Sequence, residues 1–139
     1  MEYVCDAPND ETWFRLLTEA EATAESAEMR HAVEKHYRRE WERAADSFRP
    51  LTSVYIEQDI GKAAHIKRSM PLFLTLRDQD GKGLVTAMLP PGGRGGGGQA
   101  IVVGAANADP YIDYADAIQA LADHYSIDLD RSHCYPYRR

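Results

Sequence analysis

The side chains that could do chemistry lie far apart in this sequence. Five histidines and two cysteines occur among 139 residues, and none of them forms a spacing typical of metal ligands, such as Cys-x-x-Cys. On a helix His31 and His36 would point about 140° apart, so we expect no shared metal. His133 and Cys134 are adjacent, and neighbours on an extended segment face opposite ways, which counts against an activated thiol. The sequence predicts no catalytic residue, metal or cofactor, and a non-catalytic protein is favoured over an enzyme.

A small set of polar residues could instead hold a small molecule. These candidates are His65, Arg94, Asp109, His133 and Cys134.

A glycine-rich segment could cover such a site. Residues 90–98 read PPGGRGGGG, a segment that loses much backbone entropy on ordering. Its glycines include a G-x-G-x-x-G spacing, but a predicted strand follows instead of the helix that a phosphate site requires. Two interpretations remain, a lid over a pocket between sheet and helices, or a surface connection between two strands, and we favour the connection.

Composition restricts the class of protein. A formal net charge of −6 is unfavourable for nucleic-acid binding, which depends on clustered Lys and Arg. No apolar run reaches the roughly 20 residues of a membrane-spanning helix. The first residues lack the basic and apolar segments of a signal peptide, so we expect a cytoplasmic protein whose two cysteines are free thiols. The length predicts one domain, residues 1–139.

The elements that must position these residues begin with a predicted helix from Asp10 to Phe48. This segment contains no Gly or Pro, and Pro50 stops it. If unbroken, it would be about 57 Å long, whereas a domain of this size is about 37 Å across. Either the helix is continuous and packs against a second copy, which we favour, or it breaks near residues 23–26. The contact residues would be Phe14, Leu17, Met29, Val33, Tyr37 and Trp41.

Alternating apolar residues after this helix predict strands. The runs are residues 53–57, 63–69, 72–76, 84–89 and 99–104. A second helix then begins at Asp109-Pro110 and has an apolar stripe that reaches Tyr125. The order predicts an α+β fold: a long N-terminal helix, an antiparallel sheet of four to five strands, and a C-terminal helix packed on one face.

Together these features favour a binding or interaction protein that forms a homodimer through its long helix. The alternative is a small-molecule-binding domain or enzyme in which residues 90–98 cover a pocket between sheet and helices. Neither interpretation requires a nucleic acid or a membrane as partner.

Overall fold

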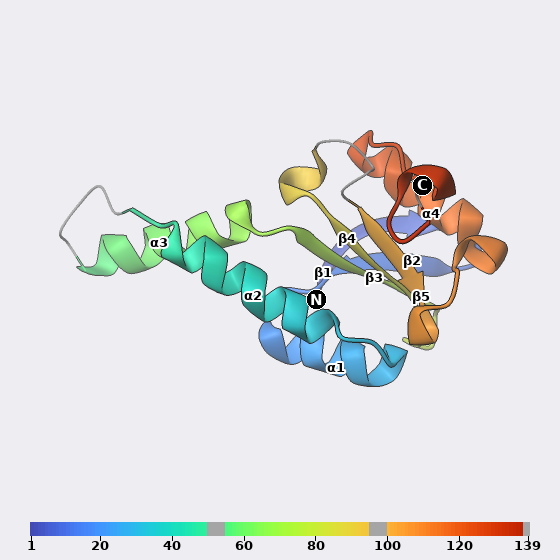
Figure 1. The fold of residues 1–139 in the computed structure, drawn as a ribbon, viewed down its shortest axis with the longest axis horizontal. Helices are drawn as coiled ribbons and strands as arrows, with labels where there is room; N and C mark the ends of the chain where they lie inside the picture. The colour runs from blue at the N-terminus through green and yellow to red at the C-terminus, as the bar shows by residue number, and fades with distance from the viewer. Residues whose placement is uncertain (50–54, 95–99, 138–139) are drawn as a thin grey trace.

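Five antiparallel strands form one sheet, shown in a computed structural model that describes residues 1–49, 55–94 and 100–137 (Figure 1). Their order in the sheet is their order in the chain, a meander. The strands are β1 (Glu2–Ala7), β2 (Glu11–Arg15), β3 (Leu72–Arg77), β4 (Gly83–Leu89) and β5 (Ile101–Gly104).

The described ranges contain four α-helices, which cover the two faces of this sheet unequally. Three lie between β2 and β3, namely α1 (Glu19–Met29), α2 (Val33–Asp46) and α3 (Tyr55–Ser69), and α4 (Tyr111–Tyr125) follows β5. In Figure 1, α4 lies on one side of the sheet and α1 with α2 on the other, while α2 and α3 extend together beyond the strands. Short 3-10 helices are η1 (Pro91–Gly93), η3 (Ala105–Asn107) and η4 (Arg131–His133).

The main core lies between the sheet and α4. Alternation on β3 sends three leucines to this face, and Val85, Ala87 and Leu89 do the same on β4. Trp13 is fully buried among them, and its Nε1 donates to the carbonyl oxygen of Ala117 on α4 at 2.8 Å. The expected C-terminal helix on one face of an antiparallel sheet is therefore confirmed.

A second core lies on the opposite face under α2 and α3. Tyr37 packs on Phe73 with ring centroids 5.1 Å apart, and Leu16, Val33 and Ile66 are buried around them. The same face buries polar side chains, among them Glu25 and Thr86. This mixed face is where the candidate site lies.

The predicted continuous helix from Asp10 to Phe48 is wrong. Its first residues form β2, which follows a tight turn in which Asn9 and Asp10 have φ values of 63° and 59°. Such a turn matches the twist of a hairpin, and Thr12, Trp13 and Phe14 have strong strand preference. Asn9 and Asp10 therefore form the turn between β1 and β2, and no helix begins at Asp10.

The remaining helical part is broken at Arg30–Ala32, not near residues 23–26. Thr18 caps α1 through its side chain, and Arg30 ends this helix in the left-handed conformation with φ 56°. The chain then turns, so that α1 and α2 pack against each other. Three of the residues expected to contact a second copy, Met29, Val33 and Tyr37, are instead buried within this chain.

The two strands predicted within residues 53–69 are also wrong, because α3 occupies residues 55–69. Residues 53 and 54 of the first run lie outside the described part of the chain. Ile66 and Met70, four residues apart, are both buried against the second core, which is helical spacing. The last three predicted strands correspond to β3, β4 and β5. Within the described ranges, no helix is long and apolar enough to cross a membrane.

Candidate functional site

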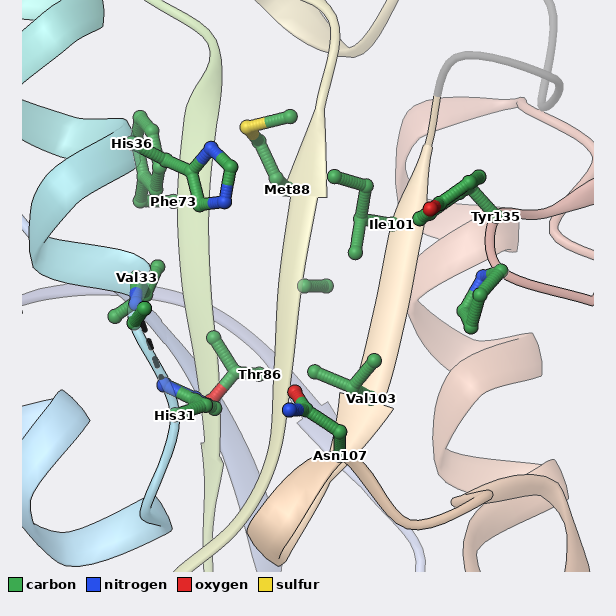
Figure 2. Close-up of a pocket in the computed structure, with 13 residues that line it drawn as sticks. His31, Val33, His36, Phe73, Thr86, Met88, Ile101, Val103, Asn107 and Tyr135 are labelled. Atoms are coloured by element: carbon green, nitrogen blue, oxygen red, sulfur yellow. Dashed lines mark hydrogen bonds between the residues drawn. The ribbon is translucent and has the colours of Figure 1, made fainter.

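A groove of about 430 Å³ lies on the sheet face that α1 and α2 leave partly uncovered. Figure 2 shows the start of α2 on one side and the C-terminal tail on the other, with β3, β4 and β5 between them. Its apolar side chains come from all of these segments: Val33, Phe73, Met88, Ile101, Val103 and Pro136. The groove is thus mainly apolar.

Strand alternation explains this lining. Thr86 and Met88 on β4 face the groove together with Ile101 and Val103 on β5, while the residues between them face α4. The far wall is held by the tail, because the Tyr135 N–H donates to the Ala100 carbonyl at 2.9 Å and the Tyr135 carbonyl accepts from Val102 at 3.2 Å. The tail thereby pairs with the edge of β5.

A buried hydrogen-bond network closes one end of the groove. The Thr86 hydroxyl donates to Glu25 Oε2 at 2.6 Å, and His31 Nε2 lies 2.8 Å from the same hydroxyl oxygen. Because the hydroxyl proton is directed at the carboxylate, the oxygen must accept from His31, so Nε2 carries the ring proton. The second Glu25 oxygen pairs with Arg77, which also contacts Glu28 at 2.7 Å.

This arrangement does not activate a nucleophile. In a catalytic triad, histidine accepts the hydroxyl proton and donates to the carboxylate, whereas here Thr86 lies between His31 and Glu25. Burial lowers the pKa of His31, an effect that the Glu25 carboxylate only partly opposes. The ring is therefore neutral at pH 7, and its Nδ1 faces the Val33 N–H at 3.4 Å. The network fixes the junction between α1 and α2 to β4.

Besides the hydroxyl of Tyr135 on the tail, two further polar side chains lie at opposite ends of the groove. His36 Nδ1 is 2.9 Å from Arg39 Nη2, and a guanidinium only donates, so Nδ1 accepts and the proton of a neutral ring resides on Nε2. In Figure 2, the His36 ring points into the groove from α2, and the Asn107 amide lies at the end near His31 and Thr86. Asn107 has φ 60°, a conformation that Asn tolerates better than most residues.

The five ligand-binding candidates from the sequence do not line this groove. His65 lies on α3, where its Nε2 is 2.8 Å from the Ser47 hydroxyl. Arg94 is exposed just after η1. Of the proposed lid, residues 95–98 lie outside the described part of the chain, and Gly93 packs against Tyr125 of α4.

The other three candidates lie near the tail, and each is already engaged. Asp109 pairs with Arg131 at 2.7 Å, and His133 pairs with Asp128 at the same distance. Cys134 is fully buried in the main core, and burial raises the pKa of its thiol. In the described part of the chain, no group of three or more His, Cys, Asp or Glu side chains is placed to hold a metal.

The six predicted contact residues do not form one exposed face. Met29, Val33 and Tyr37 are buried within the chain itself, and Phe14 is half-buried on β2. Leu17 and Trp41 are the exceptions, with 39% and 44% of their surface exposed. They lie beside two further hollows, which are described below.

Sequence reasoning missed the polar residues of the groove. The spacing of His31 and His36 tests them only as metal ligands, and nothing in the sequence places Thr86, Asn107 and Tyr135 together at a binding site. Their proximity results from the α1–α2 break and from the pairing of the tail with β5, neither of which a residue spacing reveals. Comparison with family models, curated proteins and solved structures found no match.

Proposed function

We propose that this chain is a binding protein that holds a small, mainly apolar molecule in the groove between α2 and the C-terminal tail. The observation that carries the proposal is the groove itself, an apolar hollow of about 430 Å³ on a sheet face whose other parts are packed. Sites for small molecules are typically about 300–1,000 Å³, mostly apolar, with a few polar groups.

The walls of the groove suit binding better than catalysis. Thr86 and His31 are occupied by each other and by Glu25. Glu25 is fully buried and pairs with Arg77, so this end of the site is held rigidly before any ligand arrives. A site formed in advance loses less conformational entropy on binding.

Nile red, an uncharged dye that fluoresces in apolar surroundings, tests the proposal. We expect wild-type protein to increase its fluorescence and Val103→Trp, which fills the groove from β5, to remove most of the increase. Ile112→Trp is the matched control, because Ile112 is 82% exposed on α4 and does not line the groove. Leu17→Ser tests whether the dye binds elsewhere. No increase for wild type, or an equal increase for Val103→Trp, would contradict the proposal.

Self-association is a second candidate function, supported by the surface around Leu17, Tyr37 and Trp41. These three residues are shared by two hollows of about 340 and 420 Å³. The first is also lined by Arg15 and Lys67, whereas the second is lined by Glu19, Arg38 and Glu42, which together carry one net negative charge. A two-fold axis near Trp41 would place the basic side of one copy against the acidic side of the other.

Light scattering coupled to size-exclusion chromatography distinguishes this candidate. A homodimer predicts about twice the chain mass of 15.6 kDa for the wild type and for Ile112→Ser, and the monomer mass for the double variant Leu17→Ser/Trp41→Ser. A wild-type protein that elutes as a monomer at all concentrations would exclude it.

A further inference from the structure

The balance of charges and hydrogen-bonding groups in the groove indicates the chemistry of its ligand. We infer that the ligand is an uncharged molecule with an apolar body and a hydrogen-bond acceptor directed at His36. This inference rests on the proposed function, because it specifies what the same groove binds.

The first argument concerns anions. Within residues 1–49, 55–94 and 100–137, thirteen residues line the groove, and they include no Lys, Arg, Asp or Glu. Behind Thr86 and His31 lie three carboxylates, Glu25, Glu28 and Glu34, of which the first two pair with Arg77, so this end carries net negative charge. An anion would be partly desolvated without a cationic partner among the lining residues and would meet this negative charge.

The second argument concerns cations. A ligand cation would also lack a carboxylate among the lining residues. At the opposite end, the Arg39 guanidinium lies 2.9 Å from His36 Nδ1, so a positive charge stands directly behind the ring. A cation that contacted His36 would be repelled by Arg39 and would find only an N–H group facing it. At the Thr86 end a cation would be attracted by the net negative charge behind the wall, but no lining carboxylate could pair with it, so neither sign of charge has a partner on the groove surface.

The third argument concerns hydrogen bonds. The Thr86 proton is donated to Glu25 and the His31 Nε2 proton to Thr86, so neither is available to a ligand. The Nε2 proton of His36 has no recorded partner within the described ranges and points into the groove (Figure 2). Polarisation by the guanidinium on Nδ1 makes this N–H a stronger donor. At the other end, the amide of Asn107 can both donate and accept.

Three probes of one shape test the charge preference: naphthalene-2-carboxamide, which is uncharged, naphthalene-2-carboxylate and naphthalene-2-carboxamidine. We expect the carboxamide to bind at least about ten-fold more tightly than either charged probe in calorimetric titrations, since burying a charge without a partner is strongly unfavourable. Equal or tighter binding of the carboxylate or the amidine overturns the ligand class.

Three variants test the role assigned to His36. His36→Phe keeps an aromatic ring at this position but removes the N–H donor. We expect it to weaken carboxamide binding about three- to ten-fold, because one hydrogen bond is lost. His36→Gln restores an N–H donor and should recover most of this loss. His124→Phe changes an exposed histidine on α4 and should have no effect. An unchanged affinity for His36→Phe overturns the assignment.

Failure of this inference and failure of the proposed function give different results. If Nile red binds and Val103→Trp abolishes its binding while a charged probe is preferred, the groove is a binding site and only the ligand class is wrong. If neither Nile red nor any of the three probes binds, both the proposed function and the ligand class are wrong.

Discussion

Replacement of Thr86 by Val removes the hydroxyl that joins His31 to Glu25 without leaving a cavity. Thr86 is 3% exposed, and its oxygen donates to a carboxylate at 2.6 Å and accepts from His31 at 2.8 Å. A hydrogen bond to a charged group contributes about 1.5–3 kcal/mol and a neutral one about 0.5–1.5 kcal/mol. We therefore expect Thr86→Val to lower the free energy of unfolding by about 2–4 kcal/mol, a large part of the roughly 5–15 kcal/mol typical of a domain.

Urea unfolding followed by circular dichroism measures this loss. Thr12→Val on β2 is the matched control: Thr12 is half-buried, no hydrogen bond of its hydroxyl is recorded in the described ranges, and the expected change is within about 0.5 kcal/mol. A loss below about 1 kcal/mol for Thr86→Val would refute the network. A double-mutant cycle with Glu25→Gln should show a coupling energy of about 1 kcal/mol or more, because the two side chains are in direct contact.

Three further predictions follow from burial and backbone conformation. Because burial lowers the pKa of His31, the unfolded chain binds a proton at this histidine before the folded chain does as the pH falls below about 6.5. The free energy of unfolding should therefore decrease with falling pH in this range. His31→Gln should make this decrease smaller in unfolding experiments at several pH values. Gly93→Ala would place a Cβ 2.5 Å from the Tyr125 ring, so thermal unfolding should show a clearly larger loss than for Gly81→Ala, whose site is open although φ is +83°. In a Cys5→Ser variant, which removes the half-buried second thiol, Cys134 is buried with a raised pKa and should react with Ellman's reagent only after unfolding; rapid reaction in the native variant would contradict its placement.

The second half of the fold could be predicted because its local signals agree with its tertiary contacts. Residues 72–76 and 84–89 alternate as a hairpin that buries one face, and they form β3 and β4. The predicted stripe of α4 is confirmed in its second half, where Ile118, Leu121 and Ala122 are buried in the main core, but its first residues, Ile112 and Ala115, are exposed.

The first half misled because a segment without Gly or Pro is compatible with several structures. The Asn9-Asp10 turn and the left-handed Arg30 both use residues other than Gly at positive φ, so the usual turn signals are missing. In the 63–69 run, short alternation imitated a strand, whereas Ile66 and Met70 are buried at helical spacing. The predicted helix is too long for a domain of this size, which correctly indicates that one uninterrupted helix does not fit within it. The chain avoids this by breaking at Arg30–Ala32, so that α2 folds back on α1.

The candidate site could not be predicted because it depends on contacts between distant parts of the chain. Glu25 and Thr86 are 61 residues apart, and the tail reaches the groove only through its pairing with β5. Each residue alone resembles an ordinary surface or core position. Only the fold shows that their polar atoms are mutually satisfied and that His36 is left facing the groove.

The most direct test of ligand binding in the groove is a methyl NMR titration of the methionines with naphthalene-2-carboxamide. Met88 lines the groove, Met70 lines the hollow beside Leu17 and Trp41, and Met29 is buried in the chain. We predict that the Met88 methyl signal shifts in a saturable way while those of Met70 and Met29 stay in place. A shift of Met70 without Met88, or no shift at saturating probe, would contradict binding in the groove.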